Sequence, residues 1–436
     1  MKHVPQPRRR LTTPSMTSSL SFLLAAKHTE LSELQRLAQS IALARSTAAL
    51  VHELQRERGL SNLWVGLVGS PHANLQAELQ QQQTRHTDPQ VAQWLRAADA
   101  LLTAPAPNAA RLLGRVAYAL QGLDALALLR ERVAAQALDT QGLSAAYARL
   151  IAGLLAVVFE TADQASTPEL LRPLVALFNL MQGKEWAGQE RAAGAALFAR
   201  GQAQAPELLH LSELIEAQQR CLQVFESFAS APLLQLWHQR QRAQPLGQRS
   251  RLRRLLLQTP AAGALEPPQS AAWFAVCSQC MDQMRPVEDR LTQDLVAQAE
   301  ACMGRVQAEI GQLEQRQHPE AQTDGARGNT FFEAIPPATQ PAPQGLALGL
   351  EKSVLDLVQD QDQRLQSAAA ELETLRASLN ERKLIERAKG LLMAHQQLDE
   401  PAAHKALREL AMNQNKRMVD VAEAVLSMGR LLAPRR

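Results

Sequence analysis

Apolar residues at helical spacing run through most of this 436-residue sequence. The segments with this spacing are residues 28–70, 75–101, 110–138, 143–160, 168–200, 207–228, 233–257 and 270–317. Proline, glycine, asparagine or threonine marks the breaks, and no stretch alternates apolar and polar residues as a half-buried strand does. Aromatic residues make up only 4% of the chain, and the helix-favouring residues alanine, leucine and glutamine dominate it. The sequence therefore predicts an all-α protein that begins with a double four-helix bundle.

The spacing and the composition divide the chain into five predicted parts. These are a disordered N-terminal segment (1–27), a helical domain (28–317), a Pro- and Gly-rich linker (318–349), a coiled-coil helix (350–374) and a basic C-terminal module of three helices (375–436). The coiled-coil prediction rests on apolar residues in steps of three and four from Leu350 to Leu379. This short, imperfect seam indicates a homodimer, and the alternative is that it packs on its own domain.

The charge is distributed unevenly, although the net charge of the chain is only +3. Residues 1–14 carry four basic and no acidic residues, and residues 15–318 are neutral overall. Residues 319–374 carry nine acidic and three basic residues, whereas residues 375–436 carry twelve basic and seven acidic ones. A neutral helical body is thus joined through an acidic segment to a basic module. This asymmetry indicates an anionic partner for that module.

The sequence predicts a cytoplasmic protein without a membrane-spanning segment. The N-terminal apolar run, residues 20–26, is short and ends at Lys27, and no run approaches the roughly 18 apolar residues of a spanning helix. The cysteines are Cys221, Cys277, Cys280 and Cys302, which do not form a disulfide framework in a chain of this length. Cys277 and Cys280 are expected to pack as small hydrophobic residues, and a metal or redox role is the alternative.

No catalytic motif is found in the sequence. Phosphate-binding loops, dinucleotide-binding glycine motifs, zinc-protease motifs and nucleophile elbows are all lacking, and no carboxylate pair or Ser/His/Asp set is evident. The chain is therefore predicted not to be an enzyme and to need no cofactor or metal.

Two arginines fall on the apolar stripes of predicted helices. Arg58 lies one turn after Leu54 on the stripe of residues 43–68, whereas Arg56 should point outwards. Arg191 lies on the stripe of a second segment, close to Gly188. A buried guanidinium needs a negative partner, because desolvation without one costs several kcal/mol.

The sequence leaves two identities open for that partner. One is an internal salt bridge to Glu57, Glu185 or Glu190. The other is a bound planar oxyanion, whose oxygens match the paired N–H groups of the guanidinium.

The arginine-containing segments resemble the nitrate- and nitrite-sensing (NIT) domain family. The resemblance rests on Gln55-Arg56-Glu57-Arg58-Gly59 and on Lys184-Glu185…Gly188-Gln189-Glu190-Arg191-Ala192, and Trp273-Phe274 fits the last aromatic position of the family. It covers roughly residues 40–300 and implies an all-helical double bundle that binds nitrate or nitrite between helices through arginines. The implied anion-binding residues are Arg58, Arg191, Arg251 and, ranked lower, Arg56; Arg253 or Arg254 is the alternative to Arg251.

The basic C-terminal module resembles the ANTAR module of transcription antiterminators. The motifs are Ile385…Ala388-Lys389-Gly390-Leu391-Leu392-Met393, Ala402-Ala403, Leu407-Arg408…Leu410-Ala411-Met412 and Val421-Ala422. This family implies binding to paired short RNA hairpins in a nascent leader, which prevents formation of the terminator hairpin. The RNA-binding residues expected here are Arg382, Lys383, Lys389, His404, Arg408, Lys416 and Arg417. His404 stands where the family usually has an aromatic residue.

Together these resemblances predict a nitrate- or nitrite-responsive antitermination regulator. Anion binding in the helical domain is expected to shift its helix packing and thereby to control the binding of the C-terminal module to a two-hairpin leader RNA. The alternative is an RNA-binding regulator whose helical body is a scaffold for a protein partner. A further alternative is a metal- or redox-sensing regulator that uses Cys277 and Cys280.

Overall fold

The computed structural model describes helices over most of the chain. The described residues are 19–66, 73–103, 109–165, 167–243, 245–258, 265–317, 363–364, 366–373, 381, 384–385, 387–393, 398, 400–414 and 416–432. The helices are α1 (Ser19–Gly66), α2 (Ala73–Gln81), the π-helix η1 (Gln82–Thr87), α3 (Asp88–Ala100), α4 (Ala110–Asp124), α5 (Leu126–Ala134), α6 (Thr140–Asp163), α7 (Pro168–Arg200), α8 (Ala205–Phe228), α9 (Ala231–Arg242), α10 (Leu246–Gln258), α11 (Gln269–Gln317), α13 (Glu400–Gln414) and α14 (Met418–Leu432). The prediction of an all-α protein is confirmed.

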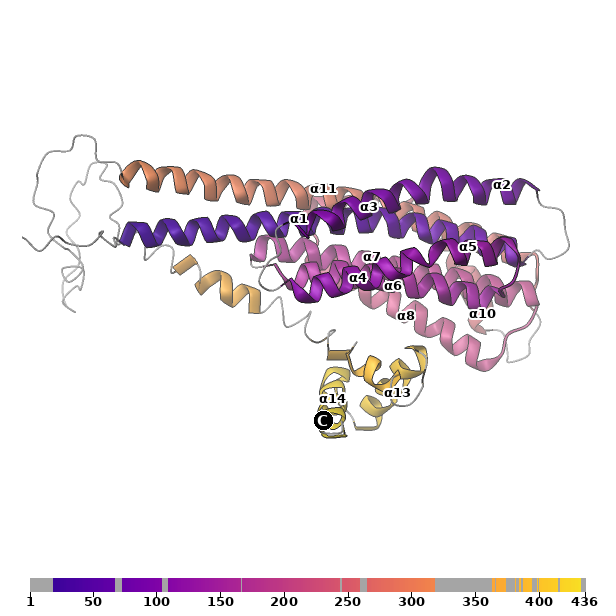
Figure 1. Ribbon diagram of the computed structural model, residues 1–436. Helices are drawn as coiled ribbons and strands as arrows, with labels where there is room; N and C mark the ends of the chain where they lie inside the picture. The colour runs from indigo at the N-terminus through magenta and orange to yellow at the C-terminus, as the bar shows by residue number, and fades with distance from the viewer. Residues whose placement is uncertain are drawn as a thin grey trace, which may run out of the picture. The chain divides into compact units, whose positions relative to one another are not determined.

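The chain forms two compact units, one of residues 1–35 and 301–369 and one of residues 36–300 and 370–436. In the first unit the start of α1 lies beside the end of α11 (Figure 1). Lys27 Nζ lies 2.6 Å from Glu309 Oε2, and Leu23 and Leu24 are buried. The prediction that residues 1–27 are disordered was wrong for residues 19–27, because these contacts stabilise the first turns of α1. Residues 1–18 lie outside the described residues.

Helices α6 and α7 form the interior of the second unit. α7 packs against both α6 and α8, and α6 also packs against α4. The sequence explains this placement, since apolar residues occupy most positions of α6 and of the first half of α7. By length and hydropathy, residues 110–134 and α6 each resemble a membrane-spanning helix, but half of the α6 stretch is buried inside the bundle. A core helix of a bundle has the same composition.

Most predicted helix boundaries lie within a few residues of the observed ones, and the differences occur at local breaks. The predicted helix 110–138 is divided into α4 and α5 at Ala125. The predicted helix 233–257 is divided into α9 and α10 just before Leu246. Pro245 explains the second break, since proline lacks the N–H that a continuous helix needs there.

The described part of the C-terminal module is helical and has its own small core. The core residues are Ala388, Leu392, Ala403, Leu407, Ala411, Val421 and Ala422. Ile385, Val425 and Leu426 pack against this core, whereas Leu410, which belongs to one of the family motifs of this module, is 37% exposed. The predicted linker 318–349 lies outside the described residues, and of the predicted coiled-coil helix 350–374 the structure describes residues 363–364 and 366–373.

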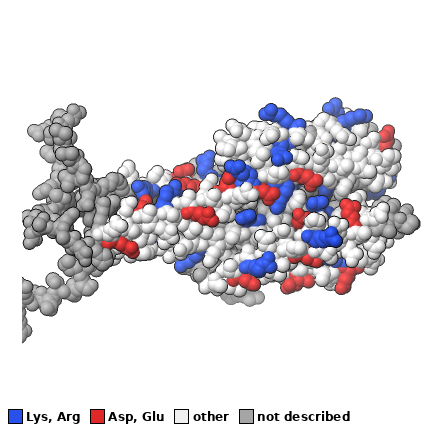
Figure 2. Space-filling view, turned by 90° about the horizontal axis from the view of Figure 1, so that it is seen from above, with Lys and Arg blue, Asp and Glu red and all other residues white. Residues whose placement is uncertain are grey.

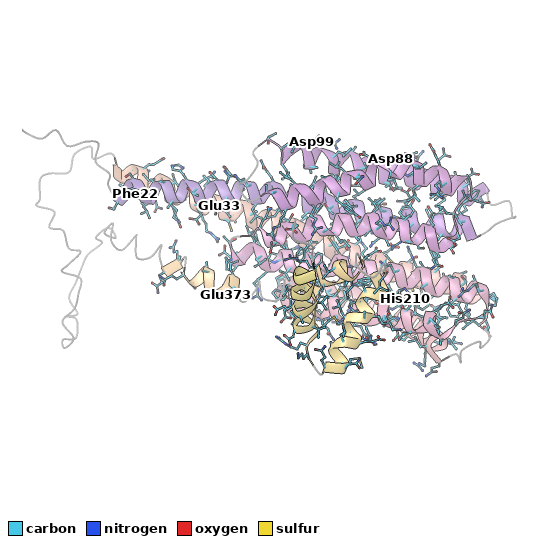
Figure 3. The ribbon with its side chains drawn as sticks, turned by 60° about the horizontal axis from the view of Figure 1, so that its bottom comes forward. Phe22, Glu33, Asp88, Asp99, His210 and Glu373 are labelled. Carbon is cyan, nitrogen blue, oxygen red and sulfur yellow. The ribbon has the colours of Figure 1, made fainter. Side chains whose placement is uncertain are left out.

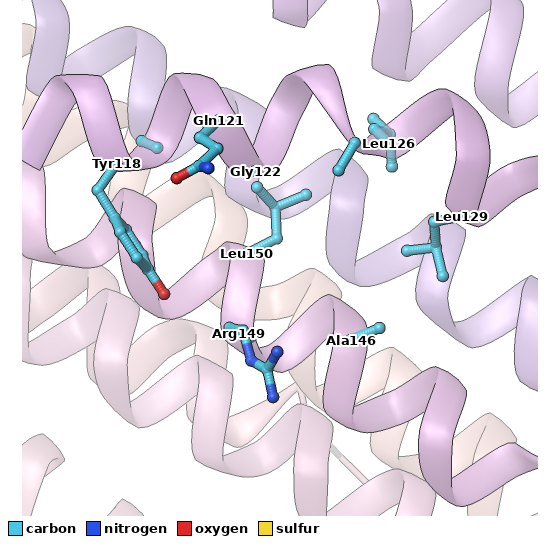
Figure 4. Close-up of a pocket in the computed structure, with 11 residues that line it drawn as sticks. Tyr118, Gln121, Gly122, Leu126, Leu129, Ala146, Arg149 and Leu150 are labelled. Carbon is cyan, nitrogen blue, oxygen red and sulfur yellow. The ribbon is translucent and has the colours of Figure 1, made fainter. Parts of the chain in front are cut away.

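The surface of the helical body carries both signs of charge and one apolar groove. Figure 2 shows basic and acidic side chains interspersed over one face. On α3, for example, Asp88 and Asp99 both lie at the surface (Figure 3). The groove lies between α4, α5 and α6, with a volume of about 270 Å³; Tyr118, Gly122, Arg149 and Leu150 are among its lining residues (Figure 4). No lining residue of this groove belongs to the buried arginine cluster described below.

Gly194 of α7 allows the buried Trp273 of α11 to approach the helix backbone. A Cβ atom at this position would overlap the indole ring, which also donates its Nε1–H to the main-chain oxygen of Arg191 at 3.0 Å. Gly194→Ala should therefore lower the free energy of unfolding by about 1–3 kcal/mol, as overpacking does. Urea denaturation measures this loss. The control is Gly114→Ala on α4, where a Cβ would have no neighbour within 4 Å and should add about 0.5–1 kcal/mol. A Gly194→Ala chain as stable as the Gly114→Ala chain would contradict the close packing.

Candidate anion-binding site

Arg58 of α1 points into the bundle, as the sequence predicts, and pairs with Glu185 of α7. Its Nη1 and Nη2 atoms donate to Glu185 Oε1 at 2.6 Å and Oε2 at 3.1 Å. The amides of Gln55 and Gln189 donate to the same carboxylate at 2.9 and 3.0 Å. Arg58 is 1% exposed, and its Nε has no hydrogen-bond partner among the described residues. For Arg58, therefore, the internal salt bridge that the sequence left open is present.

Arg191 of α7 is also buried, but its partners are neutral. It donates from Nη1 to the Ser278 hydroxyl at 2.8 Å and from Nη2 to the main-chain oxygen of Gln55 at 3.0 Å. The ring of Phe274 lies 4.6 Å from the guanidinium carbon. No carboxylate of the described residues lies within 4.0 Å of it. Burial, followed by repulsion from Arg58, lowers the pKa of Arg191 to about 10, which still leaves it charged at neutral pH.

Two glycines make room for these two arginines. A Cβ at Gly59 of α1 would lie 2.8 Å from Arg191 Nη2, and a Cβ at Gly188 of α7 would overlap Arg58 Nη2. Each helix therefore presents a glycine to the arginine of the other. This reciprocal arrangement brings two positive groups into one buried layer. Among the described residues Glu185 is the carboxylate that forms an ion pair there, with Arg58, so the charge of Arg191 is left without a salt bridge.

A second buried ionic group, which the sequence analysis missed, lies on the same three helices. Lys184 of α7 donates from Nζ to Glu288 Oε2 of α11 at 2.7 Å and lies 2.9 Å from Nδ1 of His52 of α1. Burial lowers the pKa of Lys184, although Glu288 opposes the shift. Burial and then the charge of Lys184 lower the pKa of His52 far below its usual value, so His52 is neutral and its Nδ1 accepts a hydrogen bond from Lys184 Nζ. The only sequence signal was the position of Lys184 on the apolar stripe.

Arg253 of α10, and not Arg251, points into the bundle. Arg253 forms two hydrogen bonds of 2.6 Å with Glu190 and one of 2.7 Å with Gln218. Arg251 is exposed, because two residues along a helix correspond to a rotation of about 200°. Of the two alternatives to Arg251 that the sequence left open, Arg253 is therefore the one that forms hydrogen bonds inside the bundle. Arg56 is exposed, which confirms its predicted outward direction.

Glu57, the acid inside the first family motif, has different partners from those the sequence suggested. Its carboxylate accepts from Arg130 of α5 at 2.8 and 2.9 Å and from the Tyr147 hydroxyl of α6 at 2.9 Å. Arg130 also pairs with Asp88 of α3. Glu57 therefore links α1 to the helices on the side away from Glu185 and is not available to either Arg58 or Arg191.

Cys277 and Cys280 of α11 are buried free thiols, as the sequence analysis expected of small hydrophobic residues. Cys277 belongs to an apolar cluster that includes Leu252 and Trp273. Burial, and next the charge of Glu190, raises the pKa of the Cys277 thiol. The thiolate that binds metals or attacks disulfides is thus disfavoured there.

The predicted RNA-binding residues of the C-terminal module lie in different environments. Lys416 and Arg417 are exposed, and Arg417 pairs with Asp420 at 3.0 Å. His404 and Arg408 are half-buried. Lys389 is 3% exposed, which corrects its predicted place on the surface, since it lies three residues before the core residue Leu392 and so on nearly the same face of the helix. Arg382 and Lys383 lie outside the described residues.

The fold and the buried site define a helical domain with arginines in its interior, joined in one chain to a small helical module with exposed basic residues. Comparison with family models matches residues 49–296 to the nitrate and nitrite sensing (NIT) family and residues 373–426 to the ANTAR domain family. The first match covers more than half of the chain. The chain therefore belongs to the nitrate- and nitrite-sensing family and carries an ANTAR domain at its C-terminal end.

Two relatives match along nearly the whole length. The nitrate regulatory protein of Klebsiella oxytoca is 35% identical over 411 residues, which cover 94% of this chain and 95% of that protein. The solved structure of the NasR transcription antiterminator is 31% identical, with a TM-score of 0.59, and the match covers 94% of this chain and 99% of that one. These comparisons support both resemblances that the sequence analysis stated.

The neutral, buried His52 predicts a loss of stability in acid. Its pKa lies far below the value of about 6.5 expected in the unfolded chain, so its contribution is complete above pH 6.5 and is lost as the pH falls below that value. Between pH 7.5 and 5.5 the loss from this one group should be about 1.4 kcal/mol. In urea denaturation, His52→Asn, which keeps an acceptor for Lys184 but does not titrate, should reduce the pH dependence by that amount. The control His238→Asn, at an exposed position, should not. Equal slopes in the wild type and the His52→Asn chain would contradict the assignment.

Proposed function

We propose that this chain is a nitrate- or nitrite-responsive regulator of transcription antitermination and not an enzyme. The observation that carries the proposal is the buried charge of Arg191, which has only neutral partners among the described residues. A monovalent oxyanion beside Arg191 and Arg58 would balance the charge of Arg191. Membership of the nitrate- and nitrite-sensing family supports nitrate or nitrite as that anion.

The proposed site lies among α1, α7 and α11. Besides the two guanidinium groups, Ser278 offers a hydroxyl hydrogen, and the Arg58 Nε–H has no partner in the described part of the chain. Nitrate is planar, and the paired N–H groups of a guanidinium match two oxygens of such an ion. Arg253 of the neighbouring helix α10 pairs with Glu190 of α7, and we propose that this pair supports the site. Arg56 and Arg251, both exposed, are less suited to hold the anion.

Anion binding is proposed to act on RNA through α11. This helix supplies Phe274 and Ser278 to Arg191 and continues to Gln317, where the segment that precedes the ANTAR domain begins. A ligand that binds one helix packing better than another shifts the population towards it. The proposed result is a change in the ability of the ANTAR domain to bind a two-hairpin leader RNA, so that the terminator hairpin does not form.

The proposal also includes the oligomeric state, the cellular location and the RNA contacts of the chain. We infer a cytoplasmic homodimer, because the apolar seam after Leu350 suits pairing of two copies and the RNA element has two hairpins. Contacts of Lys416, Arg417 and the other basic residues to phosphates would make RNA binding fall with salt. The ANTAR family match supports RNA as the partner of this module.

Nitrate binding to the full chain tests the sensor part of the proposal. Isothermal titration should show saturable binding to the wild type, and Arg191→Gln should weaken it by roughly tenfold or more, because a charge-assisted hydrogen bond contributes about 1.5–3 kcal/mol. The matched control is Arg56→Gln, an exposed arginine on α1, which should bind like the wild type. Equal loss in both variants, or no binding to the wild type, would contradict the site.

The response of RNA binding to nitrate tests the regulatory part. In a gel shift with a two-hairpin leader RNA, nitrate should raise the affinity of the full wild-type chain and leave that of the Arg191→Gln chain unchanged. The Arg56→Gln chain again serves as the control and should respond. If the wild type binds the RNA equally well with and without nitrate, the proposed coupling does not exist.

A further inference from the structure

We infer that Glu185 is a resident counter-anion, which competes with the ligand for the Arg58 guanidinium and thereby sets the anion concentration to which the chain responds. This inference rests on the proposed anion-binding function. It assigns an affinity-determining role to a carboxylate inside an anion-binding site.

The geometry of Glu185 is that of a bound planar oxyanion. Its two oxygens occupy both outer N–H groups of Arg58, at 2.6 and 3.1 Å, in the forked arrangement that an inorganic oxyanion would adopt. The Gln55 amide donates to one oxygen and the Gln189 amide to the other. If the carboxylate withdrew, the outer N–H groups of Arg58 would be free to donate to another anion. Glu185 is itself 1% exposed, so it lies inside the bundle and not at its surface.

The charge of the arginine layer determines the consequence of this competition. With Glu185 paired to Arg58, the charge of Arg191 is left without a salt bridge among the described residues. A monoanion that enters between them gains from Arg191 but must share or displace the Glu185 contact with Arg58. Glu185 also repels the ligand, because two like charges in one buried layer interact strongly. The carboxylate therefore stabilises the ligand-free layer and weakens ligand binding.

The other buried carboxylates of the bundle do not have this relation to Arg58 or Arg191. Glu288 pairs with Lys184, Glu190 with Arg253 and Glu57 with Arg130. Glu288 therefore offers a matched control on the same buried face. Its partner is a lysine, whose pKa burial already lowers and which can lose its proton, whereas an arginine cannot.

The test is nitrate binding to the full chain by isothermal titration, with thermal unfolding as the second measurement. Glu185→Gln should bind nitrate roughly ten- to hundredfold more tightly than the wild type, because one opposing buried charge is removed. Without nitrate its Tm should fall, since Arg58 loses its counter-charge, and saturating nitrate should raise its Tm more than that of the wild type. Glu288→Gln should leave the nitrate affinity unchanged.

Gln189→Leu provides a variant that keeps every charge. It removes one of the amide donors that hold Glu185 and changes a half-buried position, so the carboxylate should yield more readily and the affinity for nitrate should rise a few-fold. If Glu185→Gln is unfolded without ligand, the test relies on the nitrate affinity of Gln189→Leu and on whether nitrate refolds Glu185→Gln.

The outcomes separate this inference from the proposed function. If the wild type binds nitrate and both variants bind it equally or more weakly, Glu185 is not a competitor and the inference is overturned, while the proposed function stands. If neither the wild type nor any variant binds nitrate, the proposed function fails and the inference fails with it. Binding only by Glu185→Gln and Gln189→Leu would support the inference and show that the wild-type threshold lies above the concentrations tested.

Discussion

The structure of the helical domain depends on the cost of holding positive charge away from water. Lys184 and Arg58 are each only 1% exposed, and each faces a carboxylate from another helix. Such pairs link α1, α7 and α11 more specifically than apolar contacts do, because a slipped helix would leave a buried charge without its partner. Arg191 is the exception: its charge is shared among a hydroxyl, a main-chain oxygen and an aromatic face. That imbalance is the reason for proposing that an anion binds beside Arg191.

Much of this arrangement follows from helical periodicity. The apolar stripes predicted which residues lie inside, including Arg58 and Arg191, and they correctly directed Arg56 to solvent. Local phase is predictable in this way because the backbone fixes a rotation of about 100° per residue. The predicted orientation of a side chain is less accurate where the start of the helix was predicted wrongly. The exchange of Arg251 for Arg253 depends on where α10 restarts after Pro245, and the early start of α1 depends on contacts with α11.

The partners of the buried charges could not be predicted from the sequence. Glu57, Glu185 and Glu190 were equally plausible acids for the inward arginines, but each is committed to a different cation in the structure. Arg58 and Glu185 are 127 residues apart in the chain, so only the packing of whole helices brings them together. The same holds for Lys184 and Glu288. The family motifs indicated which residues matter, whereas the structure shows that one acid inside a motif belongs to a different network from its neighbours.

The reciprocal glycines have a mechanical consequence. Gly59 and Arg58 are adjacent on α1, and Gly188 lies one turn before Arg191 on α7, so each helix carries both a protruding group and a recess for the other. The arginine of each helix therefore packs against the glycine of the other. Neither helix can slide along the other by a turn without driving a guanidinium into backbone, which leaves tilting and rotation as the accessible movements of this contact.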